Sequence, residues 1–166
     1  MGLGWMFDQP RRVLLGLLLI CLAMLAYGLY LQHVVGLNPC PMCIVQRYAL
    51  ILVALVAGLG AAFGRPVVQR LAAASVFGFS AFGAFVAARQ SWLQWYPPEV
   101  VSCGRDFYGM IENFPIGRVV PMIFRGSGDC AKIDWTFLGL SLANWSFISF
   151  SLIALLGLRL VWVRRA

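Results

Sequence analysis

The side chains best suited to chemistry in this chain are its five cysteines. Two of them close the short motif Cys-Pro-Met-Cys at residues 40–43, and the others are Cys21, Cys103 and Cys130. Cysteine thiolates are nucleophiles that form, break and exchange disulfide bonds. The C-x-x-C spacing therefore indicates either a redox-active dithiol or a short structural disulfide.

The first cysteine pair stands where a helix is expected to begin. Pro41 suits the first helical position, because its missing N–H would have no partner there. Cys43 then falls in the first turn, where backbone N–H groups and the helix dipole favour a thiolate. Arg47 follows four residues later, on the same helix face and one turn deeper. An arginine inside an apolar run is costly, so Arg47 is a candidate partner of a Cys43 thiolate or of a polar ligand atom.

Several other interpretations of these residues are open. Either cysteine pair could be a structural disulfide, and Arg47 could merely extend its guanidinium to the lipid headgroups. A four-cysteine zinc site is disfavoured, because structural zinc usually needs two closely spaced pairs and 26 residues separate Cys103 from Cys130. Cys21, alone in an apolar run, is predicted to be an inert small hydrophobe.

The composition shows which environment must hold these residues. Hydrophobic residues make up 61% of the 166 residues and charged residues only 11%, against about 45–50% and about 25% in soluble globular chains. A soluble protein this apolar could not cover its surface, and a disordered chain would not be this apolar. The sequence therefore predicts an all-α membrane protein.

Four apolar segments are long enough to cross a bilayer. The predicted spans are residues 13–31, 41–63, 67–88 and 145–163, and the loops between them on one side are 32–40 and 89–144. Together they predict one integral membrane domain over residues 1–166, a four-helix bundle. The first span is interpreted as a retained helix, because its apolar run exceeds that of a signal peptide and no Ala-x-Ala site follows. Asn144 is the predicted N-cap of the last span.

Positive charges near the span ends give the orientation. The side that holds both termini and the turn between the second and third spans carries seven arginines and one aspartate. The side with the two loops carries five basic and five acidic residues. Both termini are therefore expected in the cytoplasm, and the formal charge of +7 reflects topology rather than nucleic-acid binding.

The second loop is expected to lie partly on the bilayer surface. Apolar residues recur at helical spacing over residues 107–114, and an apolar segment at 119–124 lies between two arginines. Arg89 and Gln90, at the end of the third span, are open to two interpretations: they line a ligand site, or, more simply, they form a membrane-exit anchor. Small residues recur at four-residue spacing within the spans, which indicates ordinary close packing of helices. These pairs are Ala54/Gly58, Gly60/Gly64, Ala74/Gly78 and Gly83/Ala87.

Several of these segments resemble one family of membrane proteins. Residues 38–50, Asn-Pro-Cys-Pro-Met-Cys-Ile-Val-Gln-Arg-Tyr-Ala-Leu, together with the preceding Gln32 and His33, resemble the first-loop motif of the DsbB family, disulfide bond formation protein B. Residues 127–131 and 135–140 resemble its second-loop motif. The similarity covers four spans, two outward loops, two cysteine pairs and the arginine after C-x-x-C.

The resemblance implies a multi-pass thiol oxidase of the bacterial inner membrane, a dithiol:quinone oxidoreductase with both outward loops in the periplasm. Such an enzyme reoxidises a periplasmic thioredoxin-like oxidase (DsbA) and passes the electrons to a membrane quinone, either ubiquinone or menaquinone. It implies resting pairs Cys40–Cys43 and Cys103–Cys130. The partner would attack Cys103, Cys130 would then engage Cys40, and Cys43 would pass electrons to the quinone, with Arg47 stabilising the anion and the quinone oxygen.

Other functions are weighed beside this one. The residues alone leave the direction of electron flow open, and a related relay could serve a dedicated partner instead. A membrane scaffold or transporter with purely structural disulfides is a further alternative. A metal or haem protein ranks last, because only one histidine, His33, is available and no span contains an acidic residue.

Overall fold

The structure is a computed structural model that describes residues 9–96, 131–133 and 135–163. Cys103, Cys130 and the predicted surface segments 107–114 and 119–124 lie outside the described residues. The predictions made for them therefore stay predictions.

Within the described residues, four long helices make up most of the molecule. They are α2 (Pro10–His33), α3 (Pro41–Ala62), α4 (Pro66–Trp95) and α6 (Leu142–Val163). The first three begin with a proline, which fits the first turn because the N–H groups there have no partner in the helix. All four are long and apolar enough to cross a membrane, so the predicted four-helix membrane fold is confirmed.

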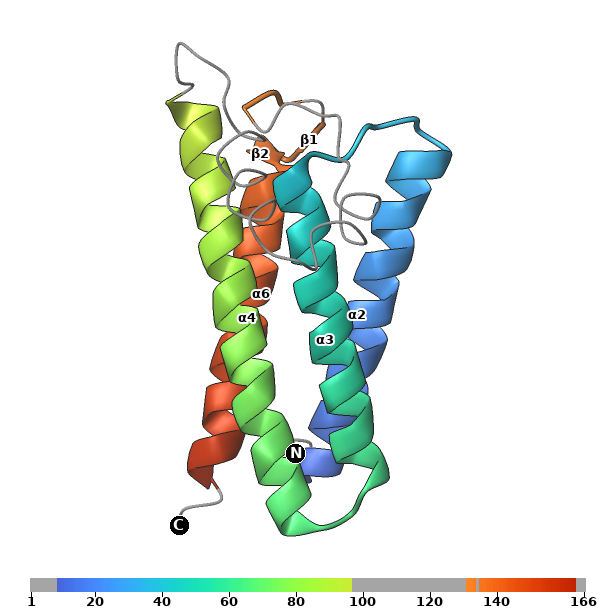
Figure 1. Cartoon of the computed structure of the whole chain (residues 1–166), viewed down its shortest axis with the longest axis vertical. Helices are drawn as coiled ribbons and strands as arrows, with labels where there is room; N and C mark the ends of the chain where they lie inside the picture. The colour runs from blue at the N-terminus through green and yellow to red at the C-terminus, as the bar shows by residue number, and fades with distance from the viewer. Residues whose placement is uncertain (1–8, 97–130, 134, 164–166) are drawn as a thin grey trace, which may run out of the picture.

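The helices run alternately up and down, as Figure 1 shows. α3 packs between α2 and α4, and α4 packs along α6, whereas α2 and α6 make little contact along their described lengths. The four helices therefore pack in the order α2, α3, α4, α6, and the first and last do not close the bundle into a ring. The start of α2 and the end of α6 lie at one end of the molecule, and the α2–α3 loop lies at the other (Figure 1).

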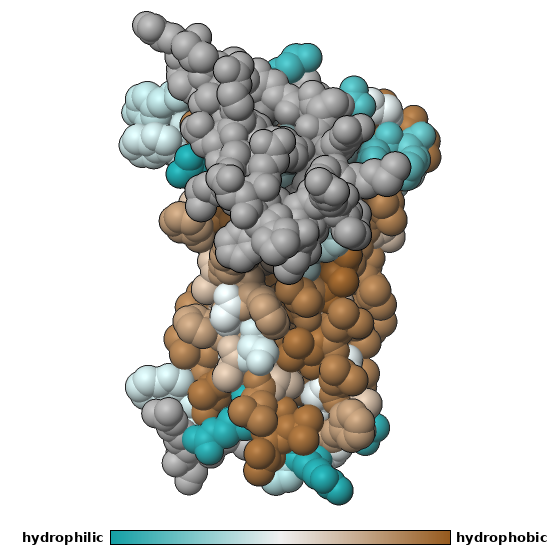
Figure 2. Space-filling model, in the orientation of Figure 1, coloured by the Kyte–Doolittle hydropathy of each residue, from teal (hydrophilic) through white to brown (hydrophobic). Residues whose placement is uncertain are grey.

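The outer surface of the helices is apolar, as expected for a protein in lipid. Large side chains such as Leu19, Phe85 and Leu155 are more than half exposed. Figure 2 shows this as a band of hydrophobic colour along the helices, with hydrophilic residues at the lower end. The interior instead combines many alanines with a few large residues such as Leu14 and Phe150. Small interior residues let the helix backbones approach closely.

Three glycines make the closest of these approaches. A Cβ added at Gly60 would lie 2.5 Å from the Cβ of Ala72 on α4, and one at Gly83 would lie 2.5 Å from the ring of Phe150 on α6. At Gly157 it would lie 2.9 Å from the backbone nitrogen of Phe77. A Cβ at Gly64 or Gly78 would meet nothing within 4 Å. The small-residue pattern therefore marks helix contacts at some of its positions only.

Two predicted helix ends were wrong. α4 continues past residue 88 to Trp95, so Arg89 and Gln90 lie inside the helix, and Gln90 is buried against α3 rather than acting as an exit anchor. A charged residue ends an apolar run but does not end a helix, and the next helix-breaking residue in the sequence is Pro97. α6 begins at Leu142, so Asn144 is its third residue and not its cap. Ser141 takes that role, because its Oγ accepts a hydrogen bond from the Asn144 N–H at 3.4 Å.

A small hairpin, absent from the sequence-based prediction, precedes α6. Strand β1 (Thr136–Phe137) pairs antiparallel with β2 (Leu140–Ser141), with Phe137 opposite Leu140. The two turn residues, Leu138 and Gly139, have φ of 53° and 77°. Tight hairpin turns of this type need positive φ at both central residues, a conformation that glycine adopts readily and leucine does not. The hairpin places aromatic side chains over the end of the bundle.

Candidate functional site

The site is centred on the cysteine pair at the start of α3. Cys40 is the N-cap residue, and its Sγ accepts a hydrogen bond from the Cys43 N–H at 3.2 Å. The two Sγ atoms lie 2.7 Å apart. Cys40 is buried, only 4% exposed, and Cys43 is half-buried. Sulfurs this close can pass between dithiol and disulfide without movement of the backbone.

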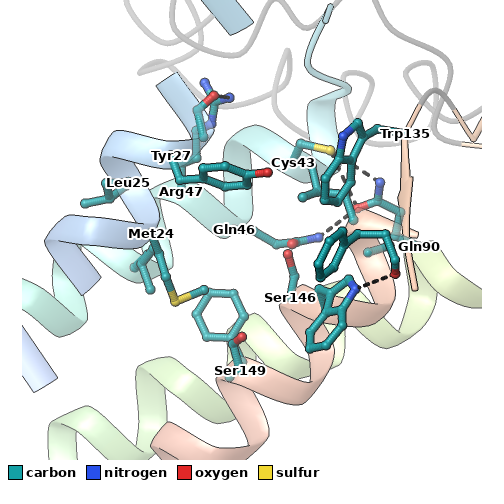
Figure 3. Close-up of a pocket in the computed structure, with 17 residues that line it drawn as sticks. Met24, Leu25, Tyr27, Cys43, Gln46, Arg47, Gln90, Trp135, Ser146 and Ser149 are labelled. Carbon is teal, nitrogen blue, oxygen red and sulfur yellow. Dashed lines mark hydrogen bonds between the residues drawn. The ribbon is translucent and has the colours of Figure 1, made fainter. Parts of the chain in front are cut away.

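Gln90 on α4 lies directly against both sulfurs. Its Nε2 donates hydrogen bonds to Cys40 Sγ and to Cys43 Sγ, each at 3.3 Å. Its Oε1 accepts a hydrogen bond from Gln46 Nε2 at 2.7 Å. Figure 3 shows Gln46 pointing from α3 across to Gln90. Two helices thus join in one polar cluster of two thiols and two amides.

Arg47 occupies the neighbouring wall of the site. It donates one hydrogen bond to Gln32 Oε1 and another, at 3.0 Å, to the backbone oxygen of Gly28, both on α2. A Cβ at Gly28 would lie 3.6 Å from Arg47 Nε, an ordinary van der Waals contact, so the guanidinium lies directly beside the α2 backbone here. Arg47 therefore links α3 to α2 and keeps a positive charge one turn below Cys43.

A cavity of about 380 Å³ opens beside these residues. Cys43, Gln46, Arg47 and Gln90 form its polar side (Figure 3). Most of the remaining lining is apolar or aromatic and comes from α2, α6 and the hairpin: Met24, Leu25, Tyr27, Trp135, Phe137, Trp145 and Phe150. Binding sites for small molecules are commonly apolar cavities of about 300–1,000 Å³ with a few polar groups, and this one fits that description.

The aromatic residues at the cavity mouth support one another. Trp135 stacks on Phe137 with ring centroids 6.0 Å apart, and it meets Tyr27 edge-on at 6.3 Å. Trp145 on α6 donates its Nε1–H to the backbone oxygen of Phe137 at 3.0 Å. The hairpin is thereby tied to both α2 and α6, and it covers the end of the cavity.

A second, smaller pocket lies on the loop side of the sulfurs. Asn38, Cys40 and Gln94 line it together with Lys132 and Ile133. Lys132 stands two residues after Cys130 in the sequence. The chain that follows Cys130 therefore passes close to Cys40.

The structure brings together three of the five predicted site residues, Cys40, Cys43 and Arg47. Cys103 and Cys130 lie outside the residues it describes. The sequence analysis missed Gln46 and set Gln90 aside, although both are buried in the site. The signal in the sequence was Gln46, a polar residue inside an apolar span. A buried amide there needs a hydrogen-bonding partner, which a polar residue of another span can supply.

Comparisons with known proteins identify the family of this chain. The profile of the family "Disulfide bond formation protein DsbB" matches residues 10–160. A protein named "Disulfide bond formation protein B" from Albidiferax ferrireducens is 65% identical, over 97% of this chain and 92% of that protein. Proteins of the same name from Polaromonas sp. and Azoarcus sp. are 67% and 52% identical, each over 93% of this chain. The four membrane helices, the cysteine pair at the start of α3 and these similarities lead to one conclusion: the chain belongs to the DsbB family of disulfide bond formation proteins.

Proposed function

We propose that this disulfide bond formation protein is a membrane thiol oxidase that reoxidises a DsbA-like periplasmic dithiol protein and passes the electrons to a membrane quinone. The observation that carries the proposal is the position of the sulfur pair. Cys43 lies on the wall of an apolar cavity within the membrane bundle, and Cys40 and Cys43 together line a smaller pocket on the loop side. One pair of sulfurs thus faces both a lipid-soluble acceptor and a thiol from the loops.

The cavity fits a quinone headgroup in its chemistry. A quinone ring is flat and apolar and carries carbonyl oxygens that accept hydrogen bonds. The cavity offers aromatic faces at Tyr27, Trp135 and Trp145, and a charged donor at Arg47. These residues would hold the ring next to Cys43 Sγ. When bound, a quinone supplies an acceptor for two electrons and two protons and is released as the quinol.

Within the described residues, the sparse contact between α2 and α6 leaves a seam beside the cavity. Both helices line the cavity, at Met24 and Leu25 on one side and Ser146 and Phe150 on the other, yet they make little contact with each other. A long isoprenoid tail can lie in this seam while the headgroup is inside. Entry from lipid then requires no helix to be displaced from a packed neighbour.

The proposed exchange steps follow from thiol–disulfide chemistry. A thiolate of the reduced partner attacks Cys103 of the Cys103–Cys130 disulfide, and Cys130 leaves as a thiolate. Cys130 then attacks Cys40 Sγ, the Cys40–Cys43 bond breaks, and Cys43 leaves with the electron pair as a thiolate. The position of Lys132 and Ile133 beside Cys40 supports the second step, because two residues span at most about 7 Å.

Arg47 has two roles in this proposal. Its guanidinium places a fixed positive charge near the thiolate that forms on Cys43, and it offers donors to a carbonyl oxygen in the cavity. Its hydrogen bonds to Gly28 and Gln32 hold it in place, so little reorganisation is needed as charge develops.

The proposed location is the bacterial inner membrane, with both termini in the cytoplasm and the cysteine pairs in the oxidising periplasm. The excess of arginine at the end of the bundle that holds the termini supports this orientation.

The direct test is turnover by purified protein with a reduced DsbA-like substrate and a soluble quinone, monitored as loss of quinone absorbance. Wild-type protein is expected to reduce quinone, and Cys43→Ser is expected to abolish the reaction because no sulfur remains beside the cavity. Cys21→Ala is the matched control, since Cys21 is a buried thiol on α2 outside the cavity lining. Turnover that survives Cys43→Ser would overturn the proposal.

A further inference from the structure

We propose that Gln46 is a positioning residue, which fixes the Gln90 side-chain amide so that its N–H groups face both cysteine sulfurs. The inference deepens the proposed function and rests on it. It is carried by three hydrogen bonds among buried side chains: Gln46 Nε2 to Gln90 Oε1, and Gln90 Nε2 to Cys40 Sγ and Cys43 Sγ.

The side-chain amide of an isolated glutamine has no preferred orientation, because a half-turn about its last bond exchanges the donor NH₂ and the acceptor oxygen. In the bundle, Gln46 Nε2 donates to Gln90 Oε1 at 2.7 Å, and only an oxygen can accept that bond. The oxygen of Gln90 is thereby held against Gln46, with Cys43 Sγ 3.8 Å away, and the NH₂ group lies closer to the sulfurs, at 3.3 Å from each. Without the donor from Gln46, nothing in this pair selects the donating orientation.

The orientation decides which charge state of the sulfurs is stabilised. N–H groups donate to a thiolate, whereas an amide oxygen would repel it. When a thiolate attacks Cys40 Sγ, the Cys40–Cys43 bond breaks and its electron pair leaves on Cys43 Sγ. Gln90 Nε2 is already 3.3 Å from that atom, so it stabilises the leaving group as the charge forms. Gln46 contributes to this only through Gln90.

Burial increases the effect of this arrangement. Gln46 is 6% exposed and Gln90 is 4% exposed, so water competes little for these donors. Hydrogen bonds to a charged atom are stronger in such surroundings, and a donor that turns away is not replaced by solvent. Among the described contacts, the hydrogen bonds of Arg47 run to α2, whereas those of Gln90 Nε2 run to the two sulfurs.

The test is a double-mutant cycle on the reactivity of Cys43, without quinone or partner protein. Full-length protein carrying Cys103→Ser and Cys130→Ser is reduced and treated with iodoacetamide at about pH 7. Alkylation of Cys43 is followed by mass spectrometry of its peptide. Gln46→Met, Gln90→Met and the double variant are compared, because methionine keeps the length and the helix preference of glutamine.

Gln90→Met is expected to slow alkylation by about tenfold, and Gln46→Met to slow it by a similar or smaller factor, through loss of a hydrogen bond to a charged atom. The double variant is expected to be no slower than Gln90→Met alone. The rates should converge as the pH is raised, because alkylation then depends less on stabilisation of the thiolate. Convergence separates an effect on the thiolate from an effect on access or packing.

Gln46→Glu provides a variant of unchanged shape. A carboxylate only accepts hydrogen bonds, so it should draw the NH₂ of Gln90 toward itself and turn the oxygen to the sulfurs. Alkylation at about pH 7 should then be slower than in Gln46→Met. Gln69→Glu is the matched control, since Gln69 is also a buried glutamine on α4 but lies 21 positions from Gln90. It should leave the rate unchanged.

Additive effects in the double variant, or an unchanged rate in Gln46→Met, would overturn the inference. Quinone turnover is measured separately on the same glutamine substitutions with all four cysteines intact. Coupled alkylation rates in the variants, together with no quinone reduction by the protein with both native glutamines, would refute the proposed function and leave the positioning role in place.

Discussion

At the scale of single residues, the site combines groups that are close in sequence with groups that are distant. Cys40, Cys43 and Arg47 lie within one helix start, so their spacing alone predicts that they share a face. Gln90 lies 47 residues beyond Cys43. Nothing in the spacing of a glutamine in an apolar helix shows which helix it will meet, so its contact with the sulfurs could not be predicted.

Arg47 offers a prediction at this scale. Arg47→Ala is expected to raise the KM for soluble quinone by about tenfold, because a charged donor to a carbonyl oxygen is lost. The quinone KM of Arg47→Lys should lie between those of the wild type and Arg47→Ala, because lysine keeps the charge but not the forked geometry that bridges Gly28 and Gln32. Steady-state kinetics at varied quinone and a fixed concentration of reduced partner give the quinone KM and the kcat of each variant.

The control for this experiment is Arg65→Ala, which removes an exposed arginine at the other end of the bundle. It should leave the quinone KM unchanged. An Arg47→Ala enzyme with wild-type kinetics would refute a role in quinone binding and leave Arg47 only as the link between α3 and α2.

At the scale of helices, the apolar segments predict how many elements there are but not where each one ends. Hydropathy falls at Arg89, yet α4 continues for nearly two further turns to Trp95. That extension is what brings Gln90 to the level of Cys43. The hairpin at 136–141 was missed because each strand has only two residues, too few for a periodic pattern.

The contact between α4 and α6 gives a prediction about stability. Gly157→Ala should destabilise the bundle by about 1–3 kcal/mol, because the new Cβ would lie 2.9 Å from the backbone nitrogen of Phe77 and neither helix can yield locally. Gly78→Ala, on α4 with nothing within 4 Å, should be neutral or slightly stabilising, since alanine has the higher helix propensity. Thermal unfolding in detergent measures both.

Equal melting temperatures for the two variants would contradict the packing described for this interface. A loss of stability in Gly78→Ala alone would contradict it as well, because that position faces open space.

At the scale of the whole molecule, charge and apolar surface predict the architecture well. The composition indicates lipid as the solvent, and the four helices present large apolar side chains outward. The seam between α2 and α6 has no counterpart in the sequence. Both helices read as ordinary apolar spans, and only their arrangement around α3 and α4 shows that they stay apart.

The orientation of the molecule can be tested with a reporter that is active only outside the cytoplasm. Fused after Arg165, it should give no signal, because arginines gather at the end of the bundle where α6 finishes. Fused after Tyr96, at the opposite end of α4, the same reporter should be active. A strong signal from the fusion after Arg165 would refute the proposed orientation.

The burial of Cys40 has a consequence for selectivity in the cell. An oxidising disulfide open to water could be reduced by any small thiol in its surroundings, without benefit to the partner protein. Cys40 is only 4% exposed, in contact with Gln90 and under the cap of its own helix. In the proposed relay, the burial of Cys40 would favour exchange with a thiol that the protein itself presents over exchange with a small thiol from solution.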